Sequence, residues 1–559
     1  MIQENRLDRA EGIFLASAAG DALGWPQELR GGHIGGKQAR RSRRPAPRYD
    51  SWIRRGGSRF GGYYSDRVEA GEYSDDTQLI CALARSYLTG SEWLEWFVEV
   101  ELPTWLLYQR GGGRAVLAAA RSWSEHRPPW HATDTKRSSD QTRRYREAGG
   151  NGAAMRVAPH VLATETREEL LRNVLFDAAT THGHPRAHIG ALIYAAALRE
   201  AFNARETVEY GQLIRAAREG ILSPSLAGDL LSNFMLEARS REGFEQEWER
   251  AAHETMVMLD FVEDAIHRSS MADDDFILDQ LGIAGPEGGS GTKTAVAAIY
   301  LASRGAARPL SGLLSAAFLD ESDTDTVGAM VGGLLGAIHG TAWLRELQLV
   351  QDSDYLRKLA RGLLKRESQF VLWADRSSTR DSQRLRDDIL NIKAGQATSF
   401  PDGRLFVVDG RITLDPGDVV RSRLLFEDGQ SMYIDQKLPR ETRREVAPSK
   451  KSAVLPQSEV RVRLLVQDLV TTVRYYTILL GREVPVQEGE ALISPQLSFR
   501  EGAQPITTEG QEVDLAIELS GRAIEQLDLE PDADSGPEWF MGVDPDGRRI
   551  RIRRRKEVR

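Results

Sequence analysis

The sequence predicts a multidomain protein in which a large, mainly α-helical region precedes a small β-rich segment and an α+β domain. The chain has 559 residues, too many for one ordinary domain. Before about residue 364, apolar and small residues recur at spacings of three and four; after about residue 396, short alternating runs are separated by turn residues. We therefore expect four parts: a helical domain (1–364), a helical connector with the β-rich segment (365–438), a polar linker (439–457) and a last domain (458–559).

Composition narrows the class of protein. A hydrophobic fraction of 41% with 28% charged residues is typical of a soluble globular chain. No apolar run reaches the roughly 20 residues of a membrane span, and residues 1–12 are too polar for a secretory signal, so we expect a cytoplasmic protein without membrane contact. The single cysteine, Cys81, lies in an apolar stretch and is interpreted as a buried packing residue. A single cysteine also fits a reducing compartment. The net charge of −9 predicts no general attraction to nucleic acid.

The helical period is clearest in seven segments, at 11–24, 76–88, 167–180, 187–201, 210–221, 292–304 and 326–342. Two of them, the first and the last, are unusually poor in large side chains. In the last, Gly328, Gly332, Gly336 and Gly340 stand one turn apart. Interior glycines each cost a helix about 1 kcal/mol relative to alanine. A whole row therefore predicts close approach of another helix.

The later part of the chain shows strand patterns. In the β-rich segment we expect strands at 404–408 and 411–414, separated by a turn at Asp409–Gly410. In the last domain a strand at 459–468 precedes a helix at 469–480. Further strands are expected at 491–499, 513–519, 539–543 and 548–553.

Three separated segments concentrate carboxylates and hydroxyls near helix starts: 20–28, 71–78 and 320–326. Oxygen ligands of this kind, held by rigid helices, are those that Mg²⁺ and Mn²⁺ favour. Several carboxylates in one pocket would repel one another unless cations lay among them. Taken alone, each of Ser74, Asp75, Asp323 and Asp325 is better explained as a helix cap than as a metal ligand. Only the two clusters together favour a metal site.

Five motifs, taken in order, extend this reading: Gly20–Gly24, Tyr73–Gln78, Gly150–Arg156, Thr181–Pro185 and Asp323–Thr326. Together they resemble the ADP-ribosylglycohydrolase family, which includes the dinitrogenase-reductase-activating glycohydrolase, over about residues 9–343. The resemblance implies an all-α, orthogonally packed fold. It also implies a binuclear centre of two Mg²⁺ or Mn²⁺ ions at the base of an ADP-ribose cleft.

The resemblance assigns roles residue by residue. The metal ligands would be Ser74, Asp75, Asp76, Asp323, Asp325 and Thr326, and Glu28 would contact or close over the metals. The residues around the substrate would be Gly149, Gly150, Asn151, Gly152, His182, Ser290, Gly291 and Thr292. His184 is interpreted as structural and Arg156 as an ion-pair partner. Two departures from the family pattern are Ser74 in place of threonine and Glu321-Ser322 in place of a glycine pair.

The implied reaction is hydrolysis of the N- or O-glycosidic bond between ADP-ribose and an acceptor, a protein side chain being favoured over a small molecule or nucleic acid. Cleavage passes through an oxocarbenium-like state, so a water must be activated. Asp75, Asp76 or Asp325 would accept its proton, with Glu28 beside them. The alternatives are a catalytically silent ADP-ribose or nucleotide sensor, and a scaffold on the same fold.

Two regions lie outside these motifs. The arginine-rich stretch at 40–59, with aromatic residues to Tyr64, is either a solvated loop or a lid that contacts the acceptor. The last domain resembles the vicinal-oxygen-chelate family of glyoxalase and bleomycin-resistance proteins over 459–553, on the motifs Val466–Leu469, Tyr475–Gly481 and Asp544–Gly547. No histidine follows His339, so we expect a recognition or dimerisation role and no glyoxalase-type metal centre.

Overall fold

The computed structural model describes most of the chain up to residue 438 and a set of strands beyond it. The described residues are 2–28, 45–56, 64–89, 92–131, 136–204, 208–232, 241–268, 272–284, 288–319, 322–366, 378–415, 417–438, 462–466, 486–487, 490–494, 497–501, 516–519, 530–531, 539–543 and 549–554. Contacts divide the chain into a first unit, Met1–Ala447, and a second unit, Pro448–Arg559. Each unit is described by itself.

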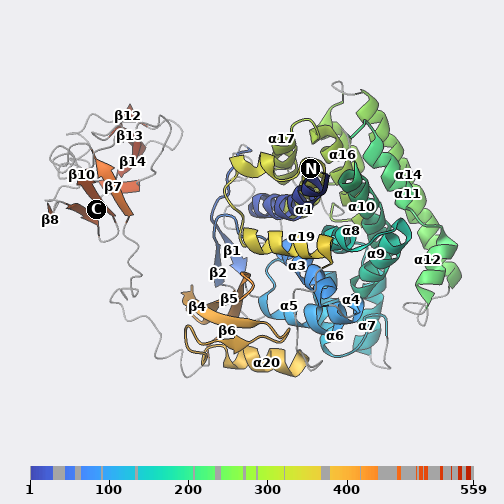
Figure 1. Ribbon diagram of the computed structural model, residues 1–559, viewed down its shortest axis with the longest axis horizontal. Coiled ribbons are helices and arrows are strands. Elements are labelled where there is room, and N and C mark those ends of the chain that lie inside the picture. Colours follow the sequence, from blue (N-terminus) through green and yellow to red (C-terminus); the bar gives the residue numbers. More distant parts are fainter. Residues whose placement is uncertain are drawn as a thin grey trace. The chain divides into compact units, whose positions relative to one another are not determined.

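The first unit is built mainly of helices that pack on one another around a large apolar core (Figure 1). Its first half contains α1 (Ile2–Gly24), η1 (Trp25–Gln27), α3 (Asp75–Leu88), α4 (Trp93–Trp96), the π-helical turn η3 (Phe97–Glu101), α5 (Leu102–Tyr108), α6 (Arg114–Ser124), α7 (Lys136–Arg146), η4 (Asn151–Arg156), α8 (Ala158–Ala163) and α9 (Arg167–Thr181). Its second half contains α10 (Pro185–Asn203), α11 (Gln212–Gly220), α12 (Pro224–Leu230), α14 (Arg241–Arg268), α15 (Asp274–Leu281), α16 (Gly291–Gly305), α17 (Pro309–Ala317), α18 (Thr324–His339), η7 (Ala342–Glu346), α19 (Ser353–Lys365) and α20 (Ser378–Asp388). Each of the seven segments predicted to be helical lies almost wholly within one of these helices; the largest difference is that α1 begins nine residues earlier than the pattern indicated.

Helices α1 and α18 approach so closely that their backbones touch, as their small residues predict. A methyl group added to Gly332 would lie 2.0 Å from the carbonyl oxygen of Ala16, and one on Gly20 would lie 2.0 Å from that of Gly328. Such distances are far inside van der Waals contact, so only glycine fits. The consequence for the site is positional, because Asp21 stands near the end of α1 and Asp325 at the start of α18.

The arginine-rich stretch is a β-hairpin where the structure describes it. Strand β1 (Trp52–Gly56) pairs in antiparallel fashion with β2 (Tyr64–Val68). Residues 29–44 and 57–63, which include the first arginines of the stretch, lie outside the described part. The hydroxyl of Tyr64 donates to Asp435 Oδ2 at 2.5 Å, and Arg54 forms an ion pair with the buried Asp66. The hairpin is thus not a solvated loop, since Tyr64 and Asp66 of β2 bond to Asp435 and Arg421 in the rest of the unit.

A four-stranded antiparallel sheet follows the helices, in the order β3-β4-β5-β6. Its strands are β3 (Thr398–Ser399), β4 (Leu405–Leu414), β5 (Val419–Phe426) and β6 (Ser431–Lys437), and it lies beside α5 and α20 (Figure 1). The expected turn at Asp409–Gly410 is wrong. The pairing shifts between Val408 and Gly410, so the chain makes a bulge within one continuous strand.

The second unit contains two further four-stranded sheets, β7-β10-β9-β8 and β11-β14-β13-β12. Their strands are β7 (Val462–Val466), β8 (Val486–Gln487), β9 (Glu490–Ser494), β10 (Leu497–Glu501), β11 (Ala516–Leu519), β12 (Glu530–Pro531), β13 (Trp539–Val543) and β14 (Arg549–Arg554). In both sheets the first strand pairs in parallel with the fourth. The run predicted at 491–499 is two strands rather than one. The linker at 439–457 and the helix expected at 469–480 lie outside the described residues.

Across the described residues, every helix is too short or too polar to cross a membrane.

Cys81 occupies the buried face of α3, with no exposed surface. Burial raises the pKa of its thiol to about 12, so little thiolate forms near neutral pH. We expect native protein at pH 8 to resist alkylation by iodoacetamide, and one equivalent to react in guanidinium chloride. Mass spectrometry would measure both; rapid labelling of the native protein would contradict the buried position.

Candidate metal centre

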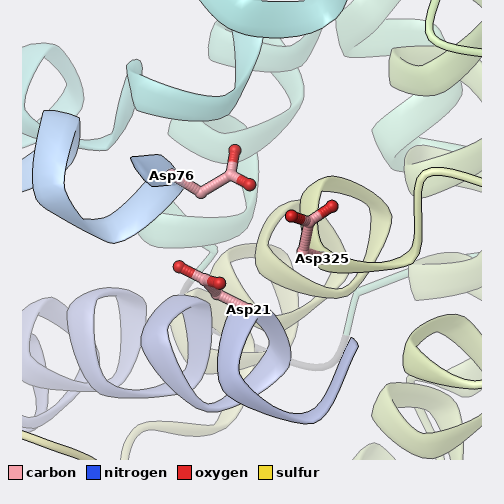
Figure 2. Close-up of side chains that lie close together, drawn as sticks. All are labelled: Asp21, Asp76 and Asp325. Carbon is pink, nitrogen blue, oxygen red and sulfur yellow. The ribbon is translucent and has the colours of Figure 1, made fainter. Parts of the chain in front are cut away.

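Three aspartates from distant parts of the chain meet in one place. Asp21 near the end of α1, Asp76 in the first turn of α3 and Asp325 in the first turn of α18 lie close together (Figure 2). One carboxylate oxygen of each lies within 4.8 Å of the others, a spacing that allows all three to bind one cation. All three side chains are buried.

A second group adjoins the first and shares one member with it. Carboxylate oxygens of Glu28, Asp323 and Asp325 also lie within 4.8 Å of one another. Glu28 follows η1 directly, and Asp323 precedes α18. Asp325 belongs to both groups, so the two candidate sites share one carboxylate.

The hydroxyl residues of the motifs lie beside these carboxylates. The Oγ of Ser74 accepts a hydrogen bond from the Asp76 backbone N at 3.2 Å, so Ser74 is the cap of α3. Asp323 is at the capping position of α18 but makes no side-chain capping bond; its Oδ2 accepts from Asn151 Nδ2 at 3.1 Å. The Oγ1 of Thr326 donates to Asp76 at 3.1 Å. The capping interpretation therefore holds for Ser74 and fails for the Asp323 side chain.

Asp21 is a site residue that sequence reasoning did not single out. Its Oδ1 accepts from the Ser74 backbone N at 2.9 Å, and its Oδ2 accepts from the Thr77 hydroxyl at 2.6 Å and backbone N at 3.0 Å. It therefore holds the start of α3 in place as well as facing Asp76. The sequence feature that could have identified Asp21 as a site residue is its position as an acid among the small residues of the Gly20–Gly24 motif.

The electrostatics of these acids differ from those of other buried acids in the same unit. Burial and then the neighbouring acids Asp21, Asp75 and Asp323 raise the pKa of Asp76 well above its usual range. Burial and then Glu28, Asp323 and Asp76 do the same for the pKa of Asp325. Burial also raises the pKa of Asp21, to about 6.

Asp66, by contrast, is a buried acid whose negative charge is neutralised by arginines. Burial alone would raise its pKa, but Arg110, Arg54 and Arg421 hold that pKa well below the ordinary value. Among the ion pairs of the described residues, none involves Asp21, Asp76 or Asp325. Their negative charge therefore lacks the compensation that arginines give elsewhere. A hard, all-oxygen donor set without a protein cation fits divalent metal ions.

Asp75, the remaining predicted acidic ligand, starts α3 beside Asp76. Its side chain is 6% exposed, and a Cβ added to Gly111 would lie 2.7 Å from its Oδ1. Gly111 has φ of +104°, a conformation that favours glycine. Asp75 does not belong to either close group of oxygens among the described residues. Its role as a ligand stays a prediction.

The predicted substrate loops lie side by side next to the acids. Gly150 forms an antiparallel bridge with Ser290; Asn151 N donates to Gly289 O at 3.0 Å and Gly291 N donates to Gly149 O at 2.9 Å. These two N–H groups join the loops to each other and so do not serve a phosphate. Asn151 links the pair of loops to Asp323 through its side chain. Thr292, in the first turn of α16, is 2% exposed.

His182 lies behind the same loop. Methyl groups built on Gly152 and Gly150 would be 3.4 and 3.9 Å from its Nε2, and its Nδ1 is 2.8 Å from the Thr181 hydroxyl. Burial, with a contribution from Arg156, lowers the pKa of His182 to about 3. The ring is therefore neutral near pH 7. It can make hydrogen bonds but cannot supply a positive charge.

Two neighbouring residues are structural, as the sequence indicated. Arg156 forms a bidentate ion pair with the buried Asp177, with nitrogen–oxygen distances of 3.1 and 3.2 Å. His184 caps α10, since its Nδ1 accepts from the Arg186 backbone N at 3.1 Å.

A family profile described as ADP-ribosylglycohydrolase matches residues 2–370, which is more than half of the 559 residues. A solved structure described as an ADP-ribosylglycohydrolase-related protein complex is similar at 24% sequence identity, covering 65% of this chain and 99% of its own, with a TM-score of 0.38. The search of curated proteins found no match.

The helices thus form an α-helical domain in which buried acids from distant segments meet in a group that could hold a metal ion. The chain belongs to the ADP-ribosylglycohydrolase family. This membership supports a glycohydrolase that acts on ADP-ribose.

Proposed function

We propose that the chain is a metal-dependent hydrolase that cleaves the glycosidic bond between ADP-ribose and a modified acceptor, with two Mg²⁺ or Mn²⁺ ions at the acidic cluster. A protein side chain is the acceptor that we favour. The proposal rests on family membership for the ADP-ribose and on one structural observation for the metals. That observation is the meeting of the buried carboxylates of Asp21, Asp76 and Asp325, none of which takes part in an ion pair among the described residues.

The residues that would hold the cations fall into two sets around Asp325. One set is Asp21 and Asp76, with the hydroxyls of Ser74 and Thr326 bonded to Asp76, and the other set is Glu28 and Asp323. Cations bound there would supply positive charge for the ribose hydroxyls and would lower the pKa of a bound water. Asp75, Asp76 or Asp325 would accept the proton of that water.

Substrate binding falls to the paired loops around Gly150 and Ser290. Their small residues leave room for a diphosphate to approach the backbone. Asn151 ties this loop pair to Asp323, so that a bound ribose and the metal ligands share one rigid frame. The neutral His182 ring supports the loop from behind.

The test is hydrolysis of peptides that carry ADP-ribose on arginine or on serine. Protein stripped with chelator and then given Mg²⁺ or Mn²⁺ is expected to release ADP-ribose, and excess chelator is expected to stop the release. Full activity in excess chelator would rule the proposal out. Calorimetry with ADP-ribose separates the alternatives: a silent sensor binds ADP-ribose without hydrolysing any conjugate, and a scaffold does neither.

For the second unit we propose a vicinal-oxygen-chelate-like recognition or dimerisation domain. Its support is the repeated strand order, in which the first strand of each sheet pairs in parallel with the fourth. Repetition of one unit within a chain is what a duplicated domain of this kind would give. The lack of histidine after His339 argues that it binds without a glyoxalase-type metal.

A further inference from the structure

We propose that the sheet β3–β6 positions the metal-binding start of α3, with Tyr433 and Ser431 of β6 as the positioning residues. The sheet begins at Thr398, beyond the residues 2–370 that match the family. This inference rests on the proposed metal site. It adds that a part of the chain outside the family domain sets the affinity of that site.

The first link runs through Glu72, two residues before Ser74. The hydroxyl of Tyr433 donates to Glu72 Oε1 at 2.5 Å, and Arg110 Nη1 donates to Glu72 Oε2 at 2.7 Å. The Arg110 guanidinium also lies 5.0 Å from the centre of the Tyr433 ring. Glu72 is 7% exposed, so both of its carboxylate oxygens are held in a nearly dry environment.

The second link runs through Tyr73, the residue directly before Ser74. Its hydroxyl donates to Asp352 Oδ2 at 2.9 Å. The same carboxylate accepts from the Ser431 backbone N at 2.9 Å and from the Ser431 hydroxyl at 2.8 Å. Asp352 has φ of +54°, a conformation uncommon for residues other than glycine. One carboxylate thus accepts hydrogen bonds from both Tyr73 and the sheet.

A third set of contacts fixes the helix farther along and the hairpin beside it. Gln430, just before β6, accepts from Arg85 of α3 at 3.0 Å. Arg421 of β5 forms ion pairs with Asp435 and with Asp66, and Asp66 in turn pairs with Arg110. All of these side chains are buried. The sheet therefore contacts α3 near its end and holds the residues just before its start, where the proposed metal ligands lie.

These contacts bear on metal binding because the residues that the sheet holds are only one to four positions from the proposed metal ligands in the chain. Glu72 and Tyr73 are both held by β6 or its partner Asp352, and the next residues are Ser74, Asp75 and Asp76. Ligand groups must be held to within about 0.5 Å for a site to work well, and supporting hydrogen bonds outside the ligand shell typically change metal affinity 10–100-fold. Removal of a single hydroxyl in β6 is expected to act in the same way.

The experiment compares Mn²⁺ affinity by titration calorimetry, on the full-length chain, well below the unfolding temperature. Tyr433→Phe keeps the ring over Arg110 and removes only the hydroxyl; Ser431→Ala removes the second hydroxyl. We expect each to weaken Mn²⁺ binding about tenfold, and Ser431→Thr, which keeps a hydroxyl, to restore it. The control is Phe406→Leu in the core of the same sheet, where Phe406 packs on Phe400 and Phe426.

A role in stability alone predicts a different pattern. In that case all the variants, Phe406→Leu included, would lower the unfolding temperature and leave Mn²⁺ affinity equal to that of the wild type. Equal affinities would overturn the inference while leaving the metal site intact. Failure of the wild-type chain to bind Mn²⁺ would instead refute the proposed function.

Discussion

Replacement of Asp325 by asparagine is expected to reduce ADP-ribose release about 10³-fold or more and at the same time to stabilise the protein in the absence of metal. Asp325 is the one carboxylate shared by both acidic groups, so its loss affects both cations. The positive charge of a bound metal contributes several kcal/mol to a reaction of this kind, and about 4 kcal/mol corresponds to roughly 10³-fold in rate. Turnover at saturating Mg²⁺ measures the first effect.

The stability effect has the opposite sign because the acids repel one another when no cation is bound. Burial and the charges of Glu28, Asp323 and Asp76 raise the pKa of Asp325, which means that its ionised form destabilises the fold. The variant should therefore unfold at a higher temperature in excess chelator. Asp409→Asn, which removes an exposed partner of Arg423, is the control and should change neither quantity. Wild-type-like turnover in Asp325→Asn would remove the carboxylate from the reaction.

Replacement of Gly332 by alanine is expected to destabilise the first unit by about 3 kcal/mol or more. Its new methyl group would lie 2.0 Å from the Ala16 carbonyl oxygen, and both atoms belong to rigid helices. Overpacking of a dense core costs about 1–3 kcal/mol when side chains can adjust, and here only backbone can move. Urea unfolding followed by far-ultraviolet circular dichroism measures the change.

The matched control is Gly410→Ala, since nothing lies within 4 Å of a Cβ at that position. It should leave the free energy of unfolding within about 0.5 kcal/mol of the wild type. Separation of α1 from α18 would also move Asp21 away from Asp325, so Gly332→Ala should lose Mn²⁺ affinity along with stability. A Gly332→Ala protein as stable as the control would contradict the close packing of the two helices.

The helices could be predicted because their signals are local. Residues 187–201 and 292–304 show the helical period in the sequence itself, and both segments lie within observed helices. The glycine row of α18 also indicated its close neighbour. The bulge at Gly410 could not be predicted in the same way, since Asp409-Gly410 has the composition of a turn and only the partner strand shows that the strand continues.

The sequence predicted those site residues that their residue type and local position identify. It did not predict those that are identified only by tertiary contacts. Asp76, Asp323 and Asp325 stood out because acids cluster at helix starts. Asp21 was missed since its partners Ser74 and Thr77 lie 53 and 56 residues away in the chain. The contact of Tyr433 with Glu72 spans 361 residues and joins two regions that the sequence assigns to different parts. No local pattern carries that information.

The most direct test of the central claim is anomalous diffraction from crystals of the full-length chain saturated with Mn²⁺. Two manganese peaks are expected, one bounded by Asp21, Asp76 and Asp325 and the other by Glu28, Asp323 and Asp325. Crystals of active protein that show no manganese among these carboxylates would contradict the account.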